Sequence, residues 1–255
     1  MSDLMLDCFG RPVFPFDLKP GDIKIEEVAE SLSKICRFYC CYKGPSHSVA
    51  EHSLNVEAFL ERESNKPLVQ LVGLLHDAHE MLLGYIPSPW YPHLIMRLEA
   101  RGFSPLSPFS PLPAPPSEHG QVPLRKYSEV LQYRVTRLLL PPCAAATYTE
   151  LHPQIMQIVD DADHQILLWE KIHILHSDLP WPNSDAPHSI PDGWLPHPAV
   201  GQHYLLIIQA FKDTYARLFS AVESSYGSPS AEAGPRSSET RPEPSPDHAN
   251  GFCGS

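Results

Sequence analysis

The apolar residues of the chain recur at helical spacing over most of its length. Within 24–37, for example, Ile25, Val28, Ala29, Leu32 and Ile35 fall on one helix face. The segment 68–83 is apolar nearly all round, so we expect this helix to lie at the centre of the fold. Helices are predicted over 24–37, 47–63, 68–83, 91–99, 124–140, 152–175 and 201–220.

The remaining segments carry little helical pattern. Residues 1–22 contain several prolines and glycines, and they predict an irregular lead with one short extended pair. Of the 29 prolines, seven lie in 104–123 and five in 228–255. We therefore predict a proline-rich loop insertion over 102–123 and a disordered tail over 224–255. The fold class is all-α, with a single helical domain over 1–223.

Charge and composition limit the partners and the compartment. A net charge of -11 argues against polymeric nucleic acid, which needs a basic face, but a bound metal could still attract a small anionic substrate. There is no apolar run of about 18 residues and no secretory signal pattern, so no membrane span and a cytoplasmic location are expected. The six cysteines have no framework spacing, which predicts free thiols in a reducing compartment.

Five polar residues fall on faces or in runs that should be apolar. His52 lies three residues after one valine and four before another, and His76 and Asp77 stand inside the apolar run LVGLLHDAHEMLLG. Asp163 belongs to the apolar row 159, 162 and 166, and Glu170 continues that row. Burying such groups without partners costs several kcal/mol. Because three helices each carry one, we expect these groups to meet.

Two imidazoles and two carboxylates suit one divalent transition metal such as Co, Mn, Zn, Fe or Ni. Four protein ligands leave positions open for water and substrate, as hydrolysis requires. Glu80, one turn after His76, is placed to exchange a proton. Taken singly, each residue has a plainer interpretation: a histidine in an amphipathic helix is most often hydrogen-bonded in the core, and Asp163 alone would be salt-bridged. The combination favours the metal site.

The order His52, His76-Asp77, Asp163 resembles the H…HD…D signature of the HD-domain metal-dependent phosphohydrolases. The resemblance is strongest to the branch with bacterial 5'-deoxynucleotidases and phage deoxynucleoside triphosphate phosphohydrolases. It extends from about Asp22 to Glu170, over half of the chain. It includes the segments GDIKIEEVAESLSKICRF, HSVAEHSLNV, LVGLLHDAHEMLLGYIPSPW, KYSEVLQYRV and DDADHQILLWE.

The resemblance implies an HD-domain helical bundle and a role for each matching residue. Glu80 and Asp77 would be catalytic, Arg37 would face the phosphate, and Phe38 would lie against the sugar. From the residues alone, an arginine such as Arg37 is more often a solvated helix end, and an aromatic such as Phe38 more often packs in the core. The implied metal ligands are His52, His76, Asp77 and Asp163.

The implied activity is hydrolysis of a nucleotide, a deoxynucleoside 5'-monophosphate or triphosphate, and the resemblance also suggests homo-oligomers. Two positions depart from the family. Tyr85 stands in GYIPSP where an Asp is usual, and the additional His79 is expected to play an outer role or none. The alternative is a non-catalytic HD module that binds a nucleotide or a protein partner. Retention of all four ligands and Glu80 counts against it.

Overall fold

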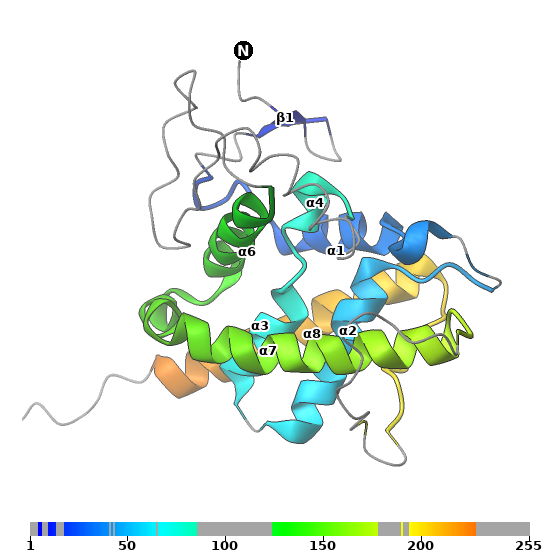
Figure 1. Ribbon diagram of the computed structural model, residues 1–255. Helices are drawn as coiled ribbons and strands as arrows, with labels where there is room; N and C mark the ends of the chain where they lie inside the picture. The colour runs from blue at the N-terminus through cyan, green and yellow to red at the C-terminus, as the bar shows by residue number, and fades with distance from the viewer. Residues whose placement is uncertain are drawn as a thin grey trace, which may run out of the picture.

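A computed structural model describes residues 5–6, 10–13, 18–40, 42, 44–64, 66–85, 124–177, 190 and 194–227. These residues are mostly helical, as predicted (Figure 1). Within them, none of the helices combines the length and apolar character needed to cross a membrane. The elements are β1 (Met5–Leu6), β2 (Pro12–Val13), α1 (Ile25–Lys34), the 3-10 turn η2 (Arg37–Cys40), α2 (Val49–Glu63), α3 (Pro67–Leu75), α4 (Glu80–Leu83), α6 (Leu124–Leu139), the 3-10 turn η3 (Pro142–Ala144), α7 (Ala145–His173) and α8 (Tyr204–Tyr226).

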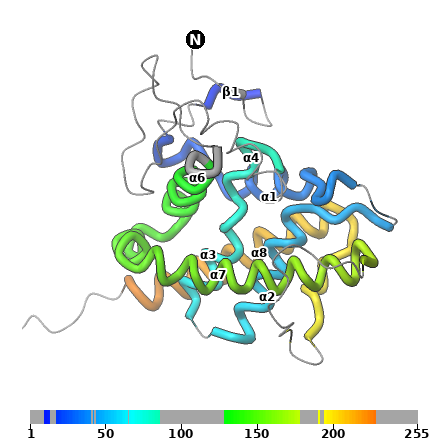
Figure 2. Tube along the Cα trace, in the orientation of Figure 1, coloured from blue at the N-terminus to red at the C-terminus, as the bar shows by residue number. Residues whose placement is uncertain are grey.

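Helix α3 is at the centre of the bundle. It contacts α2, α7 and α8, and residues 68–75 are all buried, as its uniformly apolar sequence predicts. The long helix α7 runs across α2 and α3 (Figure 2), while α1 packs on α8 and α2. At the start of the chain, β1 and β2 form the predicted short antiparallel pair, with Met5 opposite Val13.

The local sequence explains where α2 begins. Ser48 and Glu51 form a capping box, in which the Ser48 hydroxyl accepts from the Glu51 backbone N–H and the Glu51 carboxylate accepts from the Ser48 N–H at 2.7 Å. Glu51 also accepts from the Gly201 N–H at 2.8 Å, which connects this end of α2 to the turn before α8. The cap therefore fixes the end of α2 that carries His52.

One predicted helix, 68–83, is divided in two. Residues 76–79 form turns between α3 and α4, so the prediction of one continuous helix is wrong. The backbone tightens to bonds between residues three apart: the Ala78 N–H donates to the Leu75 carbonyl and the Glu80 N–H to the Asp77 carbonyl, each at 2.9 Å. This change of helical pitch falls at the HD dipeptide.

The other differences concern helix ends. Helix α7 begins at Ala145 rather than at 152 and includes Pro153 in its interior. Helix α8 extends to Tyr226, so residues 224–226 are helical rather than part of the predicted tail. Two serine hydroxyls at 224 and 225 donate to carbonyls one turn earlier. The predictions for 91–99, 102–123 and 228–255 lie outside the described residues.

The prediction of free thiols is wrong for Cys36 and Cys40. These cysteines form a disulfide with Cα atoms 5.9 Å apart, a normal separation for such a bond. Sequence spacing alone gave no sign of it, because the pairing depends on the turn η2 that brings the two residues together. Cys143 is a free, exposed thiol.

Candidate metal centre

Three of the predicted ligands converge from separate elements. His52 comes from α2, His76 from the turn after α3 and Asp163 from α7, and their ligand atoms all lie within 4.8 Å of one another. The Nε2 atom of His52 is 2.8 Å from Asp163 Oδ1, and that of His76 is 4.0 Å from the same oxygen. The helices thus bring together residues that the sequence placed on separate apolar faces.

Asp77, the fourth predicted ligand, lies beside this group. Its Oδ2 atom is 3.2 Å from His76 Nε2 and 3.8 Å from His52 Nε2. Burial alone would raise the pKa of Asp77, but the neighbouring His76 holds it well below its ordinary value. Burial alone would also raise the pKa of Asp163, but the neighbouring His52 lowers it below its ordinary value. Both carboxyl groups therefore face the two imidazoles as anions.

The histidine nitrogens fit a metal ion. Neither Nε2 atom of His52 or His76 makes a hydrogen bond, although both are buried. Both Nδ1 atoms are held: that of His52 is 2.8 Å from Glu170 Oε1, and that of His76 donates to the Gly73 carbonyl at 2.7 Å. This is the usual support of a metal-bound histidine, in which the outer nitrogen is oriented by a carboxylate or a carbonyl. The donor set of two imidazoles and two carboxylates suits a divalent transition metal.

The electrostatics of the cluster also favour a cation. Burial opposes the charged form of His76, yet the pKa of this imidazole is raised to about 10, chiefly by Asp77. Burial and Arg37 would lower the pKa of His52, but Glu170 and Asp163 raise it above its ordinary value. The carboxylates of Asp77 and Asp163 thus stabilise positive charge beside the Nε2 atoms of the two histidines.

Glu170 connects the metal centre to a second layer of charged groups. Its Oε1 atom is 2.8 Å from both His52 Nδ1 and His47 Nε2, and its Oε2 atom is 3.2 Å from Arg37 Nε. Burial would raise the pKa of this carboxyl group, but Arg37 and the histidines hold it well below its ordinary value. The sequence placed Glu170 on the row of Asp163 without a role. It gave no signal for His47, which precedes α2.

Arg37 is buried beside the cluster, which excludes a solvated helix end. Its side chain is only 6% exposed, and its Nη1 atom is 3.7 Å from Asp77 Oδ2. The guanidinium carbon lies 5.4 Å from the ring centres of both Phe38 and Tyr85. Burial would lower the pKa of Arg37, but Glu170 and the other acidic neighbours raise it, so the side chain stays cationic. Phe38 is half-buried next to this cation rather than part of the core.

The backbone after Arg37 is strained. Phe38, Tyr39 and Cys40 all have φ between 53° and 54°, a left-handed conformation that costs a non-glycine residue about 1–2 kcal/mol. The Cys36–Cys40 disulfide closes this turn. Strain of this kind persists where the surrounding structure fixes it, which is typical of functional sites.

Glu80 and His79 differ in their positions. Glu80 is buried, its Oε2 atom has no hydrogen-bond partner, and burial together with Asp77 raises its pKa well above the ordinary value. His79 is outside the cluster: it donates to the His76 carbonyl at 3.2 Å and accepts from the Ser128 hydroxyl at 2.8 Å. Burial lowers the pKa of His79 to about 4. Glu80 can therefore exchange a proton beside the cluster, while His79 connects the turn to α6.

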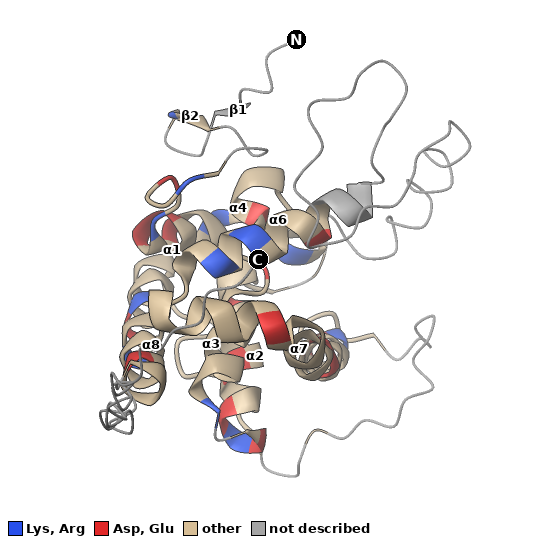
Figure 3. Ribbon diagram, turned by 90° about the vertical axis from the view of Figure 1, so that its left-hand side faces the viewer, with Lys and Arg blue, Asp and Glu red and all other residues tan. Residues whose placement is uncertain are grey.

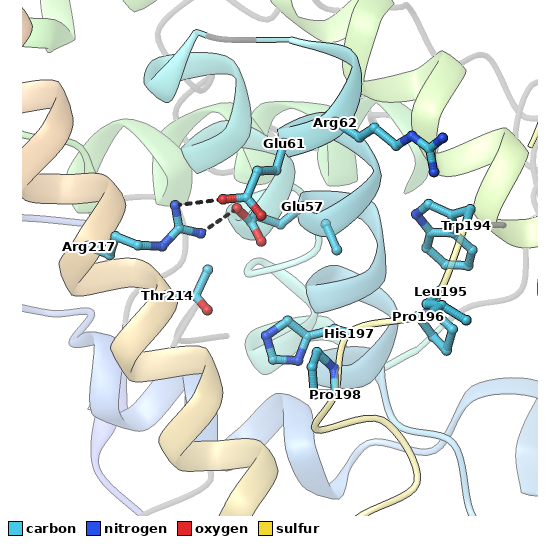
Figure 4. A pocket seen from close by; sticks show the side chains of 11 residues that line it. Glu57, Glu61, Arg62, Trp194, Leu195, Pro196, His197, Pro198, Thr214 and Arg217 are labelled. Atoms are coloured by element: carbon cyan, nitrogen blue, oxygen red, sulfur yellow. Dashed lines mark hydrogen bonds and ion pairs between the residues drawn. The ribbon is translucent and has the colours of Figure 1, made fainter. Parts of the chain in front are cut away.

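A separate hollow of about 440 Å³ lies between α2, α8 and residues 194–198 (Figure 4). In it, Arg217 forms ion pairs with Glu57 at 2.8 Å and Glu61 at 3.2 Å. None of the predicted ligands lines this hollow. In the cluster, by contrast, the buried Nε2 atoms of His52 and His76 make no hydrogen bond. We therefore place the candidate site at the cluster. Elsewhere, the described helices carry both basic and acidic residues (Figure 3).

No model of a known protein family matches the chain, and no curated protein matches it either. The assignment of a function therefore depends on the geometry of the cluster and on the resemblance of its motifs.

Proposed function

We propose that this protein is a metal-dependent phosphohydrolase of the HD-domain type that acts on a nucleotide, a deoxynucleoside 5'-monophosphate or triphosphate. The observation that carries this proposal is the convergence of two buried histidine Nε2 atoms, neither hydrogen-bonded, on the carboxylates of Asp77 and Asp163. The motif order that resembles the HD phosphohydrolases supports the same assignment. A catalytic rather than purely structural centre is supported by Arg37 and Glu80 beside it.

The residues that would hold the metal are His52, His76, Asp77 and Asp163. When bound, a divalent metal would polarise a phosphoryl oxygen and lower the pKa of the attacking water. Glu170 orients His52 through its Nδ1 atom, and the Gly73 carbonyl does the same for His76.

Arg37 binds the substrate phosphate in this proposal. Glu170 and two aromatic rings already fix its guanidinium, so little conformational freedom is lost when an anion binds. Glu80 exchanges the proton in this proposal, because burial and Asp77 raise its pKa and so favour the protonated form, which can give its proton to the leaving group. Phe38 lies next to Arg37, where the sugar of a nucleotide would follow its phosphate.

The test is to incubate the purified protein with dAMP and with dATP in the presence of Co²⁺ or Mn²⁺ and to separate the products by ion exchange. Orthophosphate from dAMP identifies a 5'-nucleotidase, and tripolyphosphate from dATP identifies a triphosphohydrolase. Binding of metal and nucleotide without any product would contradict the enzyme assignment and support the non-catalytic binding module instead.

The variants His76→Ala and Asp77→Ala should lose both metal and turnover. His173→Ala, at the exposed end of α7, is a matched control that should keep both. Metal content is measured by atomic emission on the same samples that are assayed. Turnover by a metal-free His76→Ala protein would overturn the proposal.

A further inference from the structure

We propose that Tyr39 is the platform on which the aromatic base of the substrate stacks. This inference rests on the proposed nucleotide hydrolysis and adds the residue that would contact the base of the substrate. It assigns a role to a residue that neither the metal centre nor the phosphate site uses.

Tyr39 is placed in an unusual way for an aromatic residue. It follows the buried Arg37 by two positions, yet the residue is 56% exposed. Its backbone has φ 54°, so the ring lies at the surface on a strained turn. An exposed tyrosine held in this way presents apolar surface next to the site at a low entropic cost of binding.

Aromatic rings form a continuous path from the phosphate site to Tyr39. The guanidinium carbon of Arg37 lies 5.4 Å from the Tyr85 ring centre, and the Tyr85 ring centre lies 6.1 Å from that of Tyr39, with the planes at 71°. In a nucleoside 5'-phosphate a single sugar separates the phosphate from the base. A phosphate at Arg37 therefore brings the base within reach of Tyr39, the outermost ring of this path.

The turn that carries Tyr39 is fixed from both sides. The Cys36–Cys40 disulfide closes it, and the Arg37 N–H donates to the His47 carbonyl at 2.9 Å. The ring is thus preorganised before substrate arrives. Because every base has a π-face, stacking tolerates changes of base. We therefore expect weak discrimination among the four bases and a strong preference for substrates that carry a base.

The test compares kcat/KM for dAMP and for 2-deoxyribose 5-phosphate, which has the same sugar and phosphate but no base. In Tyr39→Ala the ratio of the two values should fall about 10-fold, the size of one base-stacking contact. Tyr39→Phe keeps the ring and should keep the ratio. Tyr226→Ala removes a tyrosine of similar exposure at the end of α8 and serves as the control. An unchanged ratio in Tyr39→Ala would overturn the inference and leave the proposed function intact.

A binding measurement separates this inference from the proposed function. The Kd of dAMP is measured by calorimetry in Glu80→Ala protein, with and without Tyr39→Ala. Binding about 10-fold weaker in the double variant supports stacking even if the wild type releases no product, whereas equal Kd values overturn it. Equal thermal midpoints of the two proteins verify that the difference does not come from unfolding.

Discussion

Glu170 is the residue that connects the candidate metal centre to Arg37, the proposed phosphate ligand. Its two oxygens contact His52, His47 and Arg37, which are all buried. In Glu170→Gln the shape is kept but the anion is lost, so His52 is less firmly oriented. We expect metal affinity to fall about 10–100-fold. Titration with Co²⁺, followed by visible absorption, measures this effect. Glu150→Gln, an exposed position on the same helix, is the control, and equal affinities in both variants would contradict the role.

In the proposed mechanism, Glu80 allows the chemical step to be tested separately from metal binding. It lies beside the cluster but is not among the four ligands, and its raised pKa reflects burial and the nearby Asp77. Glu80→Ala should lower kcat by about 10²–10⁴-fold, the usual contribution of a general acid–base group. Metal content, measured on the same protein, should remain that of the wild type. A kcat within twofold of the wild type would remove Glu80 from the mechanism.

At the level of residues, the sequence predicted the cluster because polar groups on apolar faces are conspicuous. His52, His76 and Asp163 were found in this way. The contacts of Glu170 were not, because they join residues 118 and 123 positions apart, and no periodicity encodes which side chain reaches across helices. The strained turn after Arg37 was missed for a similar reason: it is closed by a disulfide that spacing alone does not predict.

At the scale of elements, the periodicity of apolar residues predicted α1, α2 and α6 within a few residues of their bounds. It failed at 76–79, since the apolar pattern continues through the turns that divide α3 from α4. It also began α7 too late, because Pro153 resembles a first-turn proline although the helix continues on both sides of it. Where packing in three dimensions decides a helix end, the one-dimensional pattern does not show it.

The contact of α6 with α7 makes stability depend on pH through His152. Its ring packs edge-on against Tyr133 of α6, at 5.0 Å, and against Tyr148 of α7, at 5.2 Å. Burial lowers the pKa of His152 in the folded protein, so the unfolded chain binds this proton first. The contribution of neutral His152 to the free energy of unfolding is therefore complete above about pH 6.5. It is lost as the pH falls from there through the folded-state pKa. His152→Phe keeps an aromatic ring that does not titrate. Urea unfolding at pH 7.5 and 5.0 should show a smaller loss of stability for the variant than for the wild type, and equal losses would exclude His152 as a source.

At the scale of the whole molecule, the candidate metal site exists only when the bundle is assembled. Its ligands come from α2, the turn after α3, and α7, and these elements contact one another in the core. In the unfolded chain the same groups are far apart and cannot bind one ion together. The folding equilibrium and metal binding are therefore linked, and the linkage can be measured without any knowledge of the substrate.

Metal binding should raise the thermal stability of the protein by an amount set by its affinity. An ion present at about 100 times its Kd adds about 2.7 kcal/mol to the free energy of unfolding, which corresponds to about 5–10 °C in Tm for a chain of this size. Melting curves of protein treated with EDTA, and then resupplied with Co²⁺ or Mn²⁺, measure the shift. The same ions should leave the Tm of His52→Ala unchanged, because this variant lacks a ligand at the centre of the cluster. Equal shifts in wild type and variant would place the ion elsewhere on the molecule, and no shift in either would show that the cluster does not hold a metal.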